Sequence, residues 1–121
     1  MSKIAFGQRG ETLAANYLRA QGYTILEVNW RCAQPKGELD IIARDGATLV
    51  FVEVRTRHSP TTETAFASIT MRKQQKLIRT VELYLQTNNL TDHAWRIDVV
   101  AVALPRAGQP IIEHVEDALD W

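Results

Sequence analysis

Three carboxylates and one guanidinium lie close together near the middle of the chain, within a stretch that is otherwise largely apolar. They are Glu38, Asp40, Glu53 and Arg55. Acidic groups on a strand surface cost desolvation energy unless a cation or hydrogen bonds compensate them. Two facing carboxylates can hold a hard divalent cation such as Mg²⁺ or Mn²⁺, with positions left for water and phosphate. The stretch is therefore a candidate metal-dependent active site.

The Asp45-Gly46 dipeptide predicts a β-hairpin, because it tolerates the positive φ angles of a tight turn. A two-residue turn there pairs Asp40 with Phe51, whereas a four-residue loop pairs Asp40 with Glu53. In both registers strand alternation gives one face with Glu38, Asp40, Phe51, Glu53 and Arg55, and another with Leu39, Ile41, Val50, Val52 and Val54. The Cβ atoms of Asp40 and Glu53 are then roughly 5–8 Å apart, which one cation can bridge. The alternative is a polar strand face that simply meets water.

The composition is that of a single globular domain over residues 1–121, which is 45% hydrophobic, 23% charged and without net charge. No apolar run approaches the length of a membrane span and no apolar leader begins the chain, so we expect a cytoplasmic protein. The single cysteine, Cys32, excludes an internal disulfide and is interpreted as an inert thiol. The three histidines show no zinc-ligand spacing.

Charge is distributed unevenly along the chain. Between residues 55 and 79 a single acid, Glu63, accompanies the six cations Arg55, Arg57, Arg72, Lys73, Lys76 and Arg79. The end of the chain is acidic and contains Glu113, Glu116, Asp117 and Asp120. This pattern predicts that one side of the protein binds a polyanion, with Arg57, Arg72, Lys73, Lys76 and Arg79 contacting phosphates. The alternative for these cations is an ordinary solvated helix face.

Hydrophobic periodicity predicts the elements that must position these residues. In chain order they are a helix over 7–21, a strand over 23–30, a loop over 31–36, the hairpin, a mobile loop over 57–67, a helix over 70–86, a central strand over 95–104 and a short edge strand over 111–115. The first helix has the apolar stripe Leu13, Ala14, Tyr17 and Leu18, and the second has Leu77, Ile78, Val81, Tyr84 and Leu85.

Several polar and aromatic residues have structural interpretations as well. Glu11 falls on the first turn of the predicted first helix, where a negative charge suits the helix dipole. Arg96 and Asp98, two residues apart on a strand, are interpreted as a structural pair in preference to site residues. The tryptophans are interpreted as core or rim residues in preference to base-stacking platforms; they are Trp30, Trp95 and Trp121.

Six motifs occur in a family-specific order, together with shorter matches at Ala14, Tyr17-Leu18 and Gly22-Tyr23. The motifs are Gly10-Glu11, Asn29-Trp30-Arg31, Gly37 to Ile42, Val50 to Arg57, Lys73 with Lys76, and Arg96 to Val100. On these motifs nearly the whole chain resembles the YraN-like family of small bacterial proteins, uncharacterised protein family 0102, which is regarded as a family of endonucleases. That family is similar to archaeal Holliday-junction resolvases and to the restriction-endonuclease-like, or PD-(D/E)XK, superfamily. The resemblance implies an α/β fold in which helices flank a mixed central sheet.

The resemblance also implies roles for individual residues. Asp40 matches the metal-binding Asp of the superfamily and Glu53 its second acidic ligand, while Glu11 matches the N-terminal helix acid of the junction resolvases. Arg55 occupies the position usually held by Lys, and it departs from the pattern because Arg keeps its proton and cannot act as a base. Leu39 stands before Asp40 where the motif is named for a proline. The implied reaction is Mg²⁺- or Mn²⁺-dependent hydrolysis of a phosphodiester.

Two classes of function remain open. The first is a metal-dependent nuclease that acts on DNA, including branched or recombination intermediates. The second is a non-catalytic nucleic-acid-binding protein that keeps the nuclease fold, which Arg55 and the zero net charge favour. The acids Glu11, Asp40 and Glu53 favour the enzyme, because without a metal they would repel a phosphate. A homodimer is expected by analogy with the resolvases, which cut two strands.

Overall fold

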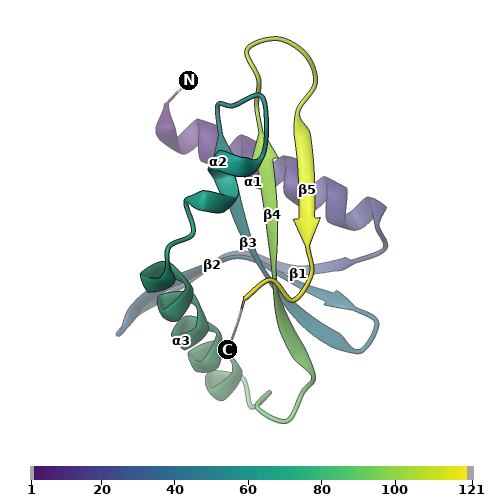
Figure 1. Cartoon of the computed structure of the whole chain (residues 1–121). Coiled ribbons are helices and arrows are strands. Elements are labelled where there is room, and N and C mark those ends of the chain that lie inside the picture. Colours follow the sequence, from purple (N-terminus) through teal and green to yellow (C-terminus); the bar gives the residue numbers. More distant parts are fainter. Residues whose placement is uncertain (1, 120–121) are drawn as a thin grey trace.

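The computed structural model describes residues 2–119 of the chain. Its elements, in order, are α1 (Lys3–Ala20), β1 (Thr24–Ala33), β2 (Lys36–Asp45), β3 (Thr48–Arg57), α2 (Glu63–Ala67), α3 (Met71–Thr87), β4 (Trp95–Ala103) and β5 (Ile111–Val115). The five strands form one sheet in the order β1-β2-β3-β4-β5, and only β3 and β4 pair in parallel. Helix α1 covers one face of this sheet, and α2 and α3 cover the other (Figure 1). The predicted mixed sheet with flanking helices is confirmed.

The core divides into two apolar clusters, one on each face of the sheet. Under α1 the cluster contains Ala14 and Leu18 of the helix with Val50, Val52 and Val100 of the strands. Under α3 it contains Leu77, Val81, Tyr84 and Leu85 with Ile42, Phe51, Ile97 and Val99. Both predicted helix stripes therefore pack as expected. Strand β4 is buried on both faces between β3 and β5, as its apolar sequence predicts.

The first helix begins earlier than the sequence suggests. It starts at Lys3, and Ser2 caps it by accepting a hydrogen bond from the backbone N–H of Ala5 at 3.0 Å. Glu11 is therefore in the middle of the helix, and the first turn contains no acidic residue. The structural alternative for Glu11, stabilisation of the helix start, was wrong, because the helix already includes the residues from Lys3 to Arg9.

Two predicted loops contain regular structure. The segment 31–36 is mostly strand, because β1 continues to Ala33 and β2 begins at Lys36, leaving the two-residue turn Gln34-Pro35. The segment 57–67 contains the short helix α2. Neither segment has a long apolar repeat, so periodicity could not reveal either element.

Of the two hairpin registers that the sequence left open, the structure has the one with Asp40 opposite Glu53, and its turn falls one residue later than Asp45-Gly46. Asp45 pairs with Thr48, so the turn consists of Gly46, with φ of +59°, and Ala47. The register is the one that brings Asp40 to the level of Glu53, since the next pair along the ladder is Ile41 with Val52. The predicted division between the two faces holds except at Leu39, which packs in the cluster under α3.

Gly10 marks the point where α1 approaches β3 most closely. A Cβ at this position would overlap Oγ1 of the buried Thr56, whereas a Cβ at Gly7 would meet nothing within 4 Å. We expect Gly10→Ala to lower the free energy of unfolding by about 1 kcal/mol, because the overpacking penalty of about 1–3 kcal/mol exceeds the gain in helix propensity. The matched variant Gly7→Ala should raise it by up to ~1 kcal/mol. Urea denaturation measures both, and equal stabilisation by the two variants would contradict the close approach.

Among the described residues, no helix combines the length and the apolar character needed to cross a membrane.

Candidate functional site

The candidate site lies where β2 separates from β3. The ladder between these strands runs from Asp45↔Thr48 to Ile41↔Val52, while β3 continues to Arg57 beside β4. Asp40 is the first residue of β2 beyond this ladder. Its Oδ2 accepts a hydrogen bond from the backbone N–H of Val54 at 2.9 Å. At this level of the sheet β2 no longer pairs with β3, so the Val54 N–H is available to hold the Asp40 side chain in place.

Glu53 contacts Asp40 across this branch point. The two carboxyl groups lie close enough to interact, and a hydrogen bond between them would need one shared proton. Burial, followed by the charge of Asp40, raises the pKa of Glu53 to about 9, and the Arg55 guanidinium only partly opposes this. Without a cation the pair therefore keeps a proton at neutral pH. Such a pair is characteristic of a functional site, because a purely structural position gains little from two buried acids.

Glu11 approaches the same carboxylates from α1. Burial and the charge of Asp40 raise its pKa, and a hydrogen bond with the Asn29 side chain opposes this shift. Asn29 has a positive φ of 53° and lies between the pairs Val28↔Ile41 and Trp30↔Leu39, at the level of Asp40. Its side chain is therefore beside the carboxylates as well as Glu11, a position that the sequence did not reveal.

Arg55 is fixed by two partners on the α3 side of the sheet. Its Nε donates to Oγ of Ser68 at 2.8 Å, and its Nη1 is 3.6 Å from a carboxylate oxygen of Glu53. Both side chains of this ion pair are 18% exposed. Because the guanidinium stays protonated, Arg55 can stabilise negative charge at the site but cannot accept a proton.

These residues line a pocket of about 580 Å³ between the β1–β2 hairpin and α3. Its walls comprise Glu11, Arg31, Cys32, Lys36, Gly37, Glu38, Asp40, Glu53, Val54, Arg55, Lys73, Lys76, Leu77 and Thr80. The structure thus brings together six of the predicted site residues from four elements, namely Glu11, Asp40, Glu53, Arg55, Lys73 and Lys76. The other three predicted phosphate-binding residues do not line it; they are Arg57, Arg72 and Arg79.

Sequence reasoning missed Arg31 and Lys36 as pocket residues, because it assigned them to a loop. The opposite charges of Arg31 and Glu38, which pair across the strands and are 3.5 Å apart, were the available signal for a second hairpin. Cys32 also lies on this wall, half-buried, with its Sγ 3.0 Å from the carbonyl oxygen of Pro35.

The carboxylates do not form a finished metal cage. Across residues 2–119, no three His, Cys, Asp or Glu side chains are gathered closely enough to hold an ion by themselves. Asp40 and Glu53 lie next to each other, whereas Glu11 and Glu38 interact with this pair only through their charges. Among these acids, the carboxylates of Asp40 and Glu53 are therefore the two best placed to bind one metal ion together.

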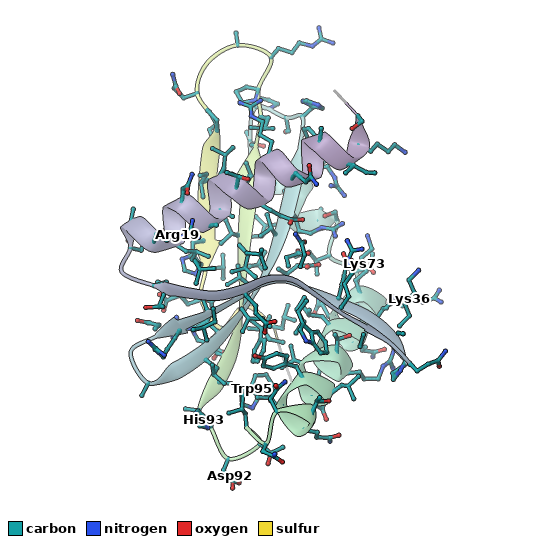
Figure 2. The ribbon with its side chains drawn as sticks, turned by 180° about the vertical axis from the view of Figure 1, so that it is seen from behind. Arg19, Lys36, Lys73, Asp92, His93 and Trp95 are labelled. Atoms are coloured by element: carbon teal, nitrogen blue, oxygen red, sulfur yellow. The ribbon has the colours of Figure 1, made fainter. Side chains whose placement is uncertain are left out.

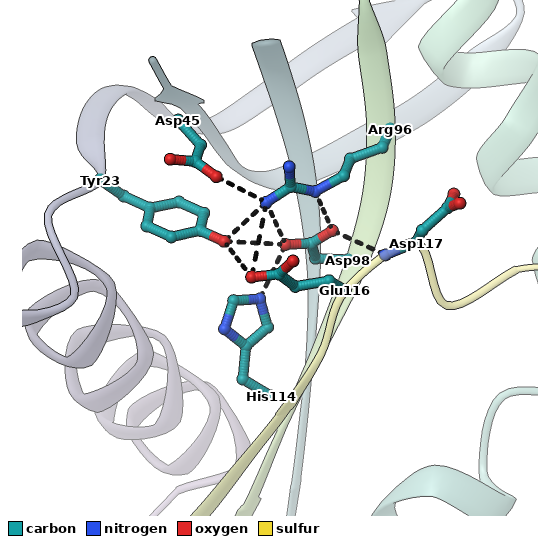
Figure 3. Close-up of polar contacts among 7 residues, drawn as sticks. All are labelled: Tyr23, Asp45, Arg96, Asp98, His114, Glu116 and Asp117. Atoms are coloured by element: carbon teal, nitrogen blue, oxygen red, sulfur yellow. Dashed lines mark hydrogen bonds and ion pairs between the residues drawn. The ribbon is translucent and has the colours of Figure 1, made fainter.

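A second polar cluster lies on the α1 face and does not reach the pocket (Figure 3). Asp98 is fully buried and accepts from Arg96 Nε at 2.9 Å and from the backbone N–H of Asp117 at 3.0 Å, while Nε2 of His114 is 2.7 Å away. Burial favours a raised pKa for Asp98, but these hydrogen bonds outweigh burial and lower it. The interpretation of Arg96 and Asp98 as a structural pair is confirmed.

Trp30 and Trp95 pack against the cluster under α3, as core or rim residues should. Two residues with predicted roles, Asp120 in the acidic end of the chain and Trp121, lie outside the described residues.

The fold and the pocket together define a small mixed α/β protein with a carboxylate pair at a branch point of its sheet. The chain belongs to uncharacterised protein family UPF0102, whose model matches residues 10–102. Similar proteins include a UPF0102 protein from Streptomyces coelicolor, 46% identical over 91% of this chain and 85% of the relative. A UPF0102 protein from Herpetosiphon aurantiacus is 42% identical over 93% of this chain and 91% of its own. One from Roseiflexus castenholzii is 43% identical over 98% and 95%.

Proposed function

We propose that this protein is a Mg²⁺- or Mn²⁺-dependent nuclease with a restriction-endonuclease-like fold that hydrolyses phosphodiester bonds in DNA. The observation that carries the proposal is the position of Asp40 and Glu53 at the branch point of the sheet, where both carboxylates line one pocket and a divalent cation would offset their charges. Oxygen donors of this kind suit Mg²⁺ and Mn²⁺. The raised pKa values of Glu53 and Glu11 are those of acids that lack a compensating cation.

Each pocket residue has a distinct role in this proposal. Asp40 and Glu53 would hold the ion, with Glu11 as a third acid that positions a water. When bound, the ion would supply Lewis acidity toward the phosphate and lower the pKa of a water. Val54 fixes the Asp40 rotamer through its N–H at 2.9 Å. Arg55, held by Ser68, places a permanent positive charge where the phosphate oxygens gain charge.

The cations of α3 would recruit the substrate. Lys73 and Lys76 are exposed at the pocket rim, where they can contact phosphates that flank the reacting one. The likeness to junction resolvases favours branched DNA as the substrate class.

The second candidate is a nucleic-acid-binding protein without catalysis. The observation that favours it is the ion pair between Arg55 and Glu53, because a guanidinium 3.6 Å from the carboxylate competes with a metal ion for its charge.

Calorimetric titration of Mn²⁺ into chelator-treated protein separates the two candidates. We expect saturable binding to the wild type, and its loss in Asp40→Ala and in Glu53→Ala, because each variant removes one of two anionic donors. Glu82→Ala, which removes an exposed acid of α3 outside the pocket, is the control and should bind as the wild type does. Unchanged binding in both pocket variants would reject the metal site. No binding to the wild type, with or without a DNA junction, would favour the non-catalytic candidate.

A further inference from the structure

The β1–β2 hairpin forms a wall of the pocket opposite α3. Arg31, Lys36 and Glu38 line it from the hairpin, and Lys73 and Lys76 line it from the helix. Figure 2 shows the hairpin reaching toward α3, with Lys36 and Lys73 on the same side of the molecule. Cations therefore lie on both sides of the carboxylate pair.

This wall is anchored on α3 and does not hang free. Gly37 lies against Thr80 so closely that a Cβ would come within 2.6 Å of its Oγ1. Further along the same hairpin, the rings of Trp30 and Tyr84 are 5.2 Å apart, and the Tyr84 hydroxyl donates to Glu27 at 3.2 Å. These contacts hold the hairpin directly against α3, and Gly37 and Thr80 both line the pocket where the two elements meet.

The cations of the two walls are not equally engaged. Arg31 is 3.5 Å from Glu38, which offsets its charge, and Nζ of Lys73 donates to the carbonyl oxygen of Ser68 at 3.3 Å. Lys36 is exposed and makes no ion pair or side-chain hydrogen bond with any residue from 2 to 119. Lys36 is therefore the cation of the hairpin wall whose charge is available to a ligand.

The pocket is small beside a double helix. A volume of about 580 Å³ is in the range of pockets that enclose a drug-sized ligand, comparable to a nucleotide or two. A duplex carries two phosphate backbones separated by grooves up to about 12 Å wide. A single backbone with cations on each side of it matches both the volume and the charge of the two walls.

We propose that one unpaired DNA strand crosses this pocket, with its backbone held by Lys36 of the β1–β2 hairpin on one side and by Lys73 and Lys76 of α3 on the other. This inference rests on the proposed function and narrows its substrate to DNA with a single-stranded segment, such as a flap or a fork. The residues that line the pocket include no aromatic side chain on which a base could stack. Recognition is therefore expected through phosphates, with little dependence on base sequence.

Fluorescence anisotropy in Mn²⁺ buffer, with probes that have a non-cleavable backbone, tests the proposal without cleavage, because the ion offsets the carboxylates that would otherwise repel a phosphate. The probes are a labelled single strand of about 15 nucleotides and a blunt duplex of the same sequence. We expect the single strand to bind at least about tenfold more tightly than the duplex. Lys36→Ala should weaken strand binding about 3- to 10-fold and reduce the slope of log affinity against log salt by about 0.7, the value for one phosphate contact on a single strand. Lys36→Arg should restore both properties.

Lys3→Ala is the matched control, since Lys3 is an exposed lysine on α1 that does not line the pocket. It should leave the affinity and the salt slope unchanged. Equal affinity for blunt duplex, an unchanged slope in Lys36→Ala, or no strand binding by the wild type would each overturn the proposal. A Mn²⁺ cleavage assay distinguishes failure of the proposed nuclease activity from failure of the proposed strand path. If strand binding depends on Lys36 but no cleavage occurs, only the nuclease activity is rejected. If cleavage occurs and its KM is unchanged in Lys36→Ala, only the strand path is rejected.

Discussion

Glu53→Gln is expected to reduce the proposed metal-dependent hydrolysis about 10³-fold while making the metal-free protein more stable at neutral and alkaline pH. The loss follows because Gln has no charge with which to hold a divalent ion. The Lewis acidity of such an ion contributes several kcal/mol, which corresponds to about three powers of ten in rate.

The gain in stability of Glu53→Gln comes from the removal of a carboxyl group that is costly to ionise in the folded protein. Burial and Asp40 raise the pKa of Glu53 in the folded protein to about 9, against an ordinary value of 4.5. The folded state therefore binds more protons than the unfolded state between these values, so wild-type stability falls as pH rises through this window. Gln cannot ionise and avoids this fall. Since a tenfold change in proton affinity corresponds to about 1.4 kcal/mol, the stability difference should grow by at least ~1 kcal/mol from about pH 5 to about pH 8.

Urea unfolding of both proteins with chelator, repeated across this pH range, measures the stability effect. Glu82→Gln, the same substitution at an exposed position outside the pocket, should show neither the pH-dependent gain nor the loss of hydrolysis. If the stability difference between Glu53→Gln and the wild type were constant with pH, Glu53 would titrate normally and the strained carboxylate pair would be refuted.

Asp98→Asn is expected to lower the free energy of unfolding by about 3 kcal/mol or more. Asp98 is fully buried and accepts hydrogen bonds from Arg96 and from the backbone of Asp117. Both of these bonds end on Oδ1, whereas Oδ2 faces Nε2 of His114 at 2.7 Å and Nη2 of Arg96 at 3.4 Å. Asn carries no charge and replaces one of the two oxygens with an amide nitrogen that cannot accept, so the partly buried Arg96 guanidinium would lose its main counter-charge. Removal of one partner from a buried ion pair typically costs about 3–5 kcal/mol. Thermal unfolding should show a midpoint lowered by more than about 10 °C.

Asp45→Asn is the matched control for this experiment. Asp45 also pairs with Arg96, at 3.2 Å, but its side chain is 46% exposed. The same chemical change should therefore cost under about 1 kcal/mol. Similar small effects in the two variants would mean that apolar packing, and not the Asp98 network, holds β5 and the following turn on the sheet.

The sequence alone determined the parts of this protein that depend on short-range patterns. Hydrophobic periodicity revealed the two long helices and their apolar stripes, and it revealed β4 as a central strand. Strand alternation within β2 and β3 placed Asp40 and Glu53 near each other. These results were accessible because the residues concerned are joined by a short turn, so few arrangements satisfy their apolar neighbours.

The exact hairpin register was less accessible. Asp45-Gly46 is a good turn sequence, yet the turn uses Gly46 and Ala47. The observed pairing places Val50 opposite Ala43 and Leu49 opposite Arg44. A shift of two residues keeps every side chain on the same face, so the apolar pattern could not separate the two registers, and only packing against both helices distinguishes them.

Only the tertiary structure decided which distant residues share the pocket. Glu11 reaches the carboxylates because Gly10 lets α1 lie directly on Thr56, and the β1–β2 hairpin reaches the pocket because Gly37 fits against Thr80 of α3. The hydrogen bonds of Asp98 likewise join β4 to residues more than a dozen positions away. Periodicity tells which face of a segment is apolar, but close contact between separate elements depends on the fit of particular side chains, which no local pattern encodes.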